Sequence, residues 1–284
     1  MIHLAREQGS HLSISALSRL FGISRSSLYR AEDHSADVAI RDEIYTIAVD
    51  WPQYGYRTVT KELHRRGFEV NSKRVRRIMR AEGLLCRRKP SRGLPYRKHG
   101  YGAHPNLARG LKPTAINQLW VTDFTYVRLF GAYLFVAIVL DAYSRRCIGW
   151  AIAPHFRTEL TIEALQKALR RRNPKPGLIH HSDRGGSYSA DDYLAILRAR
   201  NIEISMSRPG MPSDNAICER FMRTFKTEEI RVRDYLDHAD ARRSIARFLD
   251  HTYNDRRLHS SLGYRPPTEF ESVTSEEALM PIPA

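Results

Sequence analysis

The pattern of hydrophobic and polar positions changes near Asn117, which divides the chain into a helical part and a part that begins with strands. Two β-branched and aromatic runs, Leu119 to Leu129 and Ala132 to Leu140, flank Phe130-Gly131 and predict a hairpin. The pattern then predicts a strand over Arg146 to Ile152, a helix over Thr158 to Arg172, a strand over Gly177 to His181, a helix over Ser189 to Arg200 and a strand over Ile202 to Met206. This order indicates an α/β domain in which helices flank a mixed five-stranded sheet.

The pattern after the last strand is helical again. A loop with several prolines leads to Asp214, which is a good N-cap for a helix that bears Glu219. A further helix is predicted from about Ala239 to Asn254, and we expect the Pro266-Pro267 pair to end the regular structure.

The pattern of the first 35 residues predicts two short helices. The apolar stripe ends before Gly22, and Ser24 can cap a second helix up to Arg30, which is the pattern of a helix-turn-helix. The second helix would then expose a row of side chains toward base edges or phosphates. These side chains are Arg25, Ser26, Ser27 and Tyr29. An ordinary helical hairpin is the alternative.

Residues 36–83 predict an all-α DNA-binding domain of three helices, the third capped by Ser72. Five cations surround the apolar stripe of this third helix, and no anion lies among them. They are Lys73, Arg74, Arg76, Arg77 and Arg80. Because like charges repel unless phosphates neutralise them, we expect these side chains to contact DNA.

A basic linker is predicted over residues 84–116, where glycines and prolines replace apolar periodicity. Its cluster Arg87, Arg88 and Lys89 is expected to lie along DNA. We expect residues 117–272 to form the following α/β core with its C-terminal helix, and residues 273–284 to be a tail.

The charge of the chain favours a polyanionic partner. It has 46 Lys and Arg against 31 Asp and Glu, a net charge of +15, so double-stranded DNA is the first expectation. The three cysteines are odd in number and widely spaced, and none belongs to a C-x-x-C pair. This favours a reducing cytoplasm and disfavours a disulfide framework. No apolar run approaches the ~20 residues that span a bilayer, so no membrane association and no export are expected. The predicted location is cytoplasmic, at the nucleoid.

Three carboxylates carry the candidate chemistry. Asp123 lies in the first strand, Asp183 follows the fourth strand, and Glu219 lies 36 positions further along on a helix. Mg²⁺ or Mn²⁺ prefers such oxygen ligands, and two ions roughly 3.5 to 4 Å apart can activate a hydroxyl and stabilise a leaving oxygen. The combination predicts a metal site for phosphodiester chemistry.

The helix of Glu219 places Arg223 and Lys226 on the same face, where they could hold flanking phosphates. Arg184, beside Asp183, is a third candidate for phosphate contact. A simple salt bridge between Glu219 and Arg223 is the alternative interpretation of this pair.

Other chemistries fit less well. Ser182 and the adjacent histidines cannot form a catalytic triad from one strand, because neighbouring residues point to opposite faces, so one histidine is expected to face the core or a phosphate. A tyrosine recombinase could use Tyr253 as its nucleophile, but this tyrosine is expected to pack beside the tail helix. A non-catalytic DNA-binding regulator, or a decayed form of such an enzyme that only occupies DNA ends, is the remaining alternative.

Several motifs occur in an order that is characteristic of one family. They are Tyr54-Gly55-Tyr56-Arg57, Asn71-x-Lys73-Arg74-Val75, Trp120-x-Thr122-Asp123-x-Thr125, Asp141-x-x-Ser144-Arg145, His180-His181-Ser182-Asp183-Arg184-Gly185, Ser205-Met206-Ser207-Arg208-x-Gly210, Asp214-Asn215-Ala216 and Tyr253-Asn254-x-x-Arg257-x-His259-x-x-Leu262-Gly263-Tyr264. The chain thereby resembles, over nearly its whole length, the orfB product of the IS-three family of bacterial insertion sequences.

The resemblance implies an RNase H-like core of the retroviral-integrase type, which binds two Mg²⁺ ions through Asp123, Asp183 and Glu219. It implies a DDE transposase that nicks the end of its element and transfers the 3′-hydroxyl to another phosphodiester. It also implies a homo-oligomer on DNA. The family's active protein is usually a frameshift fusion with an upstream orfA product, which is a further expected partner.

Overall fold

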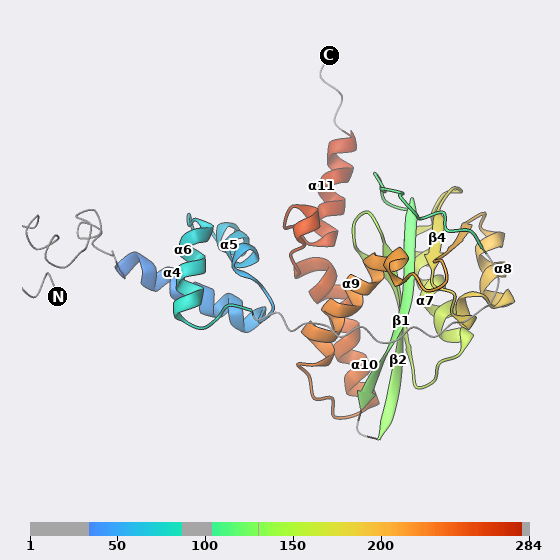
Figure 1. Ribbon diagram of the computed structural model, residues 1–284, viewed down its shortest axis with the longest axis horizontal. Coiled ribbons are helices and arrows are strands. Elements are labelled where there is room, and N and C mark those ends of the chain that lie inside the picture. Colours follow the sequence, from blue (N-terminus) through green and yellow to red (C-terminus); the bar gives the residue numbers. More distant parts are fainter. Residues whose placement is uncertain (1–33, 87–103, 130, 280–284) are drawn as a thin grey trace, which may run out of the picture.

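The computed structural model describes residues 34–86, 104–129 and 131–279, and Figure 1 shows a helical region beside a larger α/β core. The predicted helix-turn-helix with Arg25, Ser26, Ser27 and Tyr29 lies outside the described residues. The linker cations Arg87, Arg88 and Lys89 lie outside them as well. No helix in the described part is long and apolar enough to cross a membrane.

The helical region consists of α4 (His34–Asp50), α5 (Tyr56–Arg65) and α6 (Ser72–Ala81), in agreement with the three predicted helices. Buried aliphatic side chains from all three, among them Ile44, Leu63 and Val75, form its core. The predicted cap at Ser72 is wrong by one residue. Asn71 is the N-cap, because its side chain accepts a hydrogen bond from the backbone N–H of Arg74.

The cations of α6 are less isolated than the sequence indicates. Asp37, a buried residue of α4, accepts hydrogen bonds from the guanidiniums of Arg74 and Arg77, each at 2.7 Å. The expectation of five cations without an anionic partner is therefore wrong for these two, because the anion comes from another helix. Lys73, Arg76 and Arg80 remain exposed.

The core contains the five predicted strands, which form one mixed sheet in the order β3-β2-β1-β4-β5. Strands β1 (Leu119–Leu129), β2 (Ala132–Asp141) and β3 (Cys147–Ala153) pair antiparallel, whereas β4 (Ile179–Ser182) and β5 (Glu203–Met206) add in parallel. The predicted α/β class with a mixed five-stranded sheet is confirmed.

Helices cover both faces of this sheet (Figure 1). α7 (Thr158–Arg172) and α8 (Asp191–Ala199) pack on one face, and α9 (Ala216–Phe225) and α10 (His238–Arg247) pack on the other. The close approach of α7 explains Gly149 in β3. A Cβ at this position would lie 2.3 Å from the carbonyl oxygen of Ala164, which leaves room only for glycine.

The C-terminal part contains more regular structure than predicted. α10 continues as a π-helical segment, Phe248–Arg256, and a last helix, α11 (Pro267–Leu279), follows. The expectation that Pro266-Pro267 ends the regular structure is wrong, because proline is well tolerated in the first turn of a helix. Buried Glu271 of α11 pairs with Arg146 and Arg172, which ties this helix to the core.

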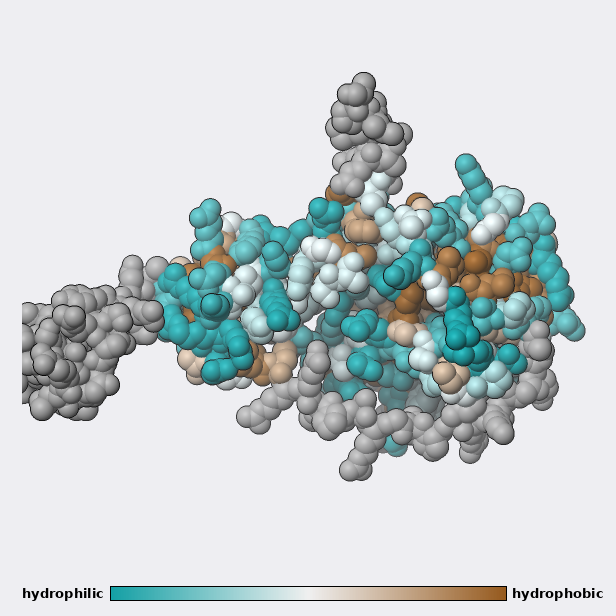
Figure 2. Space-filling model, turned by 45° about the horizontal axis from the view of Figure 1, so that its top comes forward, coloured by the Kyte–Doolittle hydropathy of each residue, from teal (hydrophilic) through white to brown (hydrophobic). Residues whose placement is uncertain are grey.

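The helical region contacts the core through its second helix and the segment before it. The hydroxyl of Tyr54 accepts a hydrogen bond from the backbone N–H of Leu258 at 2.8 Å, and Leu258 lies in the apolar core of the helical region. Arg65 forms two hydrogen bonds to the carboxylate of Glu269. Hydrophilic side chains cover much of the described surface of both parts (Figure 2).

Candidate active site

The sheet brings the first two carboxylates together. Asp123 lies within β1, where it is paired with Ile138 of β2, and Asp183 directly follows β4. In the parallel pairing of β1 and β4, Val121 lies opposite His181, so the same register continued by two residues brings Asp123 beside Asp183. Neighbouring strands are separated by about 4.8 Å, so the two aspartates lie side by side where β4 ends next to the middle of β1.

Glu219 reaches the same place from a helix. It lies in the first turn of α9, and a cavity of about 220 Å³ is lined by Asp123, Asp183 and Glu219 together. Asn215, the residue directly before α9, lines this cavity too. Its amide donates a hydrogen bond to the carbonyl oxygen of Thr122 at 3.0 Å, which anchors the start of α9 to β1.

The predicted role of Asp214 as N-cap is wrong. Its carboxylate instead accepts hydrogen bonds from the guanidinium and backbone N–H of Arg208 and from the amide of Asn106. The N-cap position belongs to Asn215, which makes no side-chain cap bond. Asp214 therefore fixes the loop before α9 rather than the helix end itself.

The electrostatics of the cavity are those of an acidic site whose negative charge is only partly compensated. Burial, together with the nearby charge of Asp183, raises the pKa of Asp123 to about 7. The backbone N–H of Phe124 and the ammonium of Lys226 lower this pKa in part, while Glu219 raises it. A group with this pKa is half protonated near neutral pH, and a cation bound beside it would restore the carboxylate.

Backbone groups fix the two aspartates. The N–H of Phe124 donates to Oδ1 of Asp123 at 2.8 Å, and the N–H of Gly185 donates to Oδ1 of Asp183 at 2.9 Å. A Cβ at position 185 would lie only 3.0 Å from that Asp183 oxygen, so glycine allows the backbone to approach the carboxylate. Both acids are thus held by rigid parts of the fold.

The donor set fits a divalent hard cation, because all three side chains offer carboxylate oxygens. The arrangement is open: Glu219 is exposed, and within residues 34–86, 104–129 and 131–279 no three His, Cys, Asp or Glu side chains are grouped closely enough to hold one metal ion. The carboxylates therefore surround a common cavity without meeting at one point.

The predicted phosphate contacts differ in their surroundings. The charge of Lys226 is close enough to lower the pKa of Asp123, although Lys226 does not line the acidic cavity. Arg184 lines the cavity, but its guanidinium donates to the carbonyl oxygen of Ser207 at 2.8 Å. Arg223 is exposed, and the described residues show no salt bridge between it and Glu219. The alternative interpretation of that pair is thus not supported.

The histidines beside Asp183 are structural. His181 contacts the hydroxyls of Ser205 and Ser207 at 2.8 and 3.0 Å, and His180 contacts the hydroxyl of Tyr193 at 3.1 Å. Burial lowers the pKa of His180 to about 3 and of His181 to about 4, so both rings are neutral. The sequence indicated one histidine in the core, whereas both are buried. The Ser-x-Ser spacing on β5 and after it was the signal for the partners of His181.

Tyr253 is buried in the π-helical segment, where its ring packs edge-on against Phe221 and His259. It thus has a packing role, within the continuation of the helix predicted from about Ala239 to Asn254 and against Phe221 of α9. Burial raises its pKa well above the usual range, which disfavours the ionised phenolate that a nucleophile needs.

Comparisons with known families agree with this architecture. The sequence matches the family described as "Integrase core domain" over residues 113–212, and a second family of the same description over residues 200–267. It matches the family described as "HTH-like domain" over residues 35–92.

Individual relatives are similar over most of their length. The transposase for insertion sequence element IS904 of Lactococcus lactis is 34% identical over 78% of this chain and 89% of its own. The transposase InsF for insertion sequence IS3A of Escherichia coli is 32% identical over 93% of this chain and 95% of its own. A solved structure of the HTLV-2 integrase catalytic core domain in complex with magnesium has a TM-score of 0.46 and 15% identity, covering 56% of this chain and 99% of that chain.

These relatives and domains identify the kind of enzyme. Transposases with an integrase core are polynucleotidyl transferases of the DDE type, which carry out DNA transposition and integration. The two matches at more than 30% identity each extend over more than two thirds of both chains. The chain therefore belongs to the IS3 (IS-three) family of insertion-sequence transposases.

Proposed function

We propose that Asp123, Asp183 and Glu219 are the catalytic residues of this transposase and that they hold two Mg²⁺ ions, which Mn²⁺ can replace. The observation that carries this proposal is their shared cavity, in which burial and the neighbouring carboxylate raise the pKa of Asp123 to about 7. Two such ions would supply activation of an attacking hydroxyl and stabilisation of the leaving oxygen during in-line displacement.

The protein's own residues position the site and bind the phosphates of the DNA. Asp123 and Asp183 are fixed by backbone N–H groups, so they set the position of the site before DNA arrives. Glu219 is exposed on the first turn of α9, so its side chain can turn toward the aspartates when DNA is bound. Lys226 and Arg223 lie on the following turns, where each can bind a phosphate oxygen.

The DNA surface of this proposal extends beyond the cavity. Arg184 is part of it, although its bond to the carbonyl of Ser207 limits its reach. On α6, the exposed Lys73, Arg76 and Arg80 are better placed for phosphates than Arg74 and Arg77, which already bind Asp37.

The assembly and location follow from the same reaction. Because transposition joins two DNA ends to a target, we propose that the active form is a homo-oligomer on DNA, in which the upstream orfA product takes part. A nucleoid-associated cytoplasmic location agrees with Cys86, Cys147 and Cys218, which are all free thiols.

The test uses the full chain and a labelled duplex that carries the terminal repeat of its element. We expect Asp183→Asn to bind this duplex as well as the wild type but to abolish nicking and strand transfer in Mg²⁺. The exposed variant Arg198→Ala, which lies on α8, serves as the matched control and should cleave normally.

A second readout follows the metal directly. Binding of Mn²⁺ measured by electron paramagnetic resonance should be weakened at least tenfold by Asp183→Asn, since a carboxylate ligand is lost. Equal cleavage by variant and wild type, or cleavage that persists in chelator, would show that the three acids are not a metal site. Binding without any cleavage by the wild type would favour the non-catalytic regulator.

A further inference from the structure

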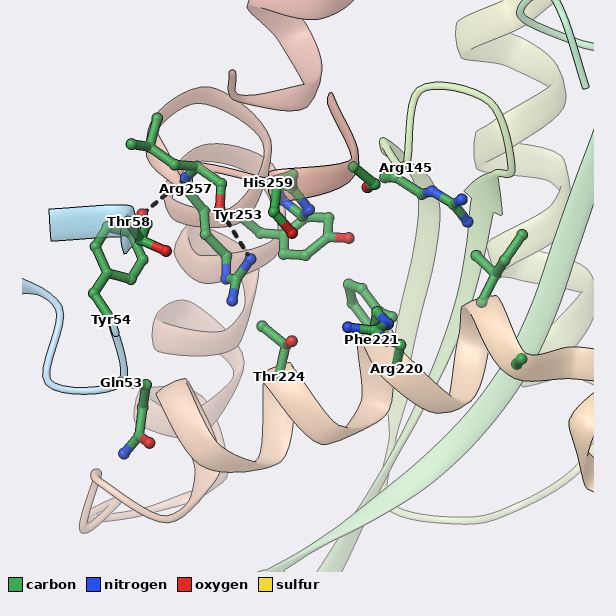
Figure 3. Close-up of a pocket in the computed structure, with 15 residues that line it drawn as sticks. Gln53, Tyr54, Thr58, Arg145, Arg220, Phe221, Thr224, Tyr253, Arg257 and His259 are labelled. Carbon is green, nitrogen blue, oxygen red and sulfur yellow. Dashed lines mark hydrogen bonds between the residues drawn. The ribbon is translucent and has the colours of Figure 1, made fainter. Parts of the chain in front are cut away.

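A second cavity, of about 590 Å³, lies where the helical region meets the core (Figure 3). One side is formed by the segment around Tyr54 and Thr58, and the other side by α9 and the loop after β2. The C-terminal segment with Tyr253 and His259 closes a third side. This volume is in the range of ligand pockets and exceeds what a single phosphate needs.

Three arginines line this cavity, and two of them have no ion pair. Arg257 binds Glu228 through two hydrogen bonds of 2.7 Å, so its charge is compensated. Arg145 and Arg220 make neither a hydrogen bond nor an ion pair with any residue of the described part. In Figure 3 both lie on the core side of the cavity, across from Tyr54 and Thr58.

The two unpaired guanidiniums lie near each other. Burial lowers the pKa of Arg145, and the charge of Arg220 lowers it in addition. Arg145 also adopts a left-handed backbone conformation, with φ of +62°, so the loop holds its side chain at this place at some conformational cost. Two like charges in such a position are unfavourable unless an anion lies between them.

The other polar groups of the cavity suit an anion or its sugar. Ser260, Ser261 and Thr224 offer hydroxyls. Nε2 of His259 is buried and has no hydrogen-bond partner among the described residues. Burial lowers the pKa of His259 to about 3, so this ring brings no charge and remains available as a polar contact.

Helix α9 separates this cavity from the acidic one. Asn215 and Glu219 line the acidic cavity, whereas Ile217 and Arg220, on the same turn, line the second. An α-helix with its side chains is about 10–12 Å across. Along one strand of a duplex, successive phosphates rise by roughly 3.4 Å, so this distance corresponds to about three nucleotides.

We propose that this cavity is a second phosphate-binding site, in which Arg145 and Arg220 jointly hold one backbone phosphate of the DNA strand whose scissile phosphate occupies the acidic cavity. The proposal rests on the proposed function, since it assumes that DNA reaches Glu219. The bound phosphate lies about three nucleotides from the scissile one, by the helix width given above.

The salt dependence of binding tests the shared phosphate. Binding of the full chain to a random-sequence duplex is measured by fluorescence anisotropy at several KCl concentrations in EDTA, so that cleavage plays no part. For Arg220→Ala we expect the slope of log K against log salt to fall by about 0.9, which is roughly an eightfold loss of affinity at 0.1 M salt. Arg220→Lys should restore most of this slope, because it keeps the charge.

The double variant separates one shared contact from two independent ones. If Arg145 and Arg220 hold the same phosphate, Arg145→Gln combined with Arg220→Ala should lose little more than either single change. Arg198→Ala on α8 is the control and should leave the slope unchanged. Additive losses, or equal losses in the control, would overturn the proposal. Because Arg220 is exposed, its variant remains informative even if Arg145→Gln is poorly folded.

The position is tested with duplexes of the terminal repeat in which single phosphates are replaced by neutral methylphosphonates. One replacement, about three nucleotides from the cleaved bond, should slow wild-type cleavage and leave the slower cleavage by Arg220→Ala unchanged. A replacement profile that is the same for both proteins would contradict the assignment. Absence of wild-type cleavage would instead contradict the proposed function, while the salt slopes would still report on the cavity.

Discussion

Asp123→Asn should make the metal-free protein more stable, although it is expected to abolish catalysis. The folded state holds the pKa of Asp123 at about 7, against 3.8 for an ordinary aspartate, because of burial and of Asp183. A raised carboxyl pKa means that the folded state binds the proton more tightly than the unfolded state does. Stability is therefore lost as the pH rises from about 4 to about 7, and the amide, which does not titrate, avoids this loss.

The magnitude follows from the size of the shift. At about 1.4 kcal/mol per pKa unit, ionisation of Asp123 costs roughly 4 kcal/mol in full, of which about 2 to 3 kcal/mol falls between pH 5 and pH 8. For a core of this size, that difference corresponds to roughly 4–12 °C in Tm. Asp123→Asn should thus gain in stability relative to the wild type by this amount when both are moved from pH 5 to pH 8.

The measurement is thermal unfolding followed by circular dichroism, in EDTA, at pH 5 and pH 8. Addition of Mg²⁺ at pH 8 should raise the Tm of the wild type and not that of the variant, because only the wild type has the complete carboxylate set. Asp214→Asn is an opposite control. Its partner Arg208 holds the pKa of Asp214 well below its usual range, so loss of this charge should destabilise the protein at pH 8. Parallel pH profiles of wild type and Asp123→Asn would refute the reasoning.

Two further changes test how the fold supports the site. Asn215→Leu removes the hydrogen bond to Thr122 and leaves its buried carbonyl unpaired, at a cost of about 1–3 kcal/mol, so the Mg²⁺ concentration needed for half-maximal cleavage should rise; an unchanged metal titration would argue against an anchoring role. Glu271→Ala leaves the nearly buried guanidinium of Arg172 without its carboxylate, which should cost about 3–5 kcal/mol in urea unfolding. A loss below 1 kcal/mol, the range of exposed pairs, would contradict a buried pair at this place.

The parts of the fold that depend on local periodicity could be predicted from the sequence. The hairpin of β1 and β2 and the helix α7 have the predicted ranges within a residue, because their apolar positions repeat without interruption. The hairpin and α7 need no knowledge of distant contacts. The convergence of Asp123 and Asp183 follows once β4 is placed parallel beside β1, because the register then brings the residue after β4 next to Asp123.

The features that could not be predicted depend on partners that the local hydrophobic pattern does not indicate. Asp214 resembles a helix cap because the neighbouring residues indicate only that a helix starts there. Nothing in the local pattern indicates that its carboxylate binds Arg208 instead. Asp37 neutralises cations some 40 positions further on, across two helices. Arg145 follows a strand in a short loop, and nothing local indicates that it meets Arg220. In each case the fold brings a charged neighbour, of opposite sign for Asp214 and Asp37 and of like sign for Arg145, that the local pattern does not indicate.

Helix α9 links these observations, because its first turn is shared by both cavities. Asn215 anchors this turn to β1, Glu219 extends from it toward the aspartates, and Arg220 extends from it toward the helical region. A DNA strand that binds Arg220 on one side and a cation on the other would exert force on the same helical turn. The two proposed sites therefore share one structural support, the start of α9, so a displacement of this turn would affect both.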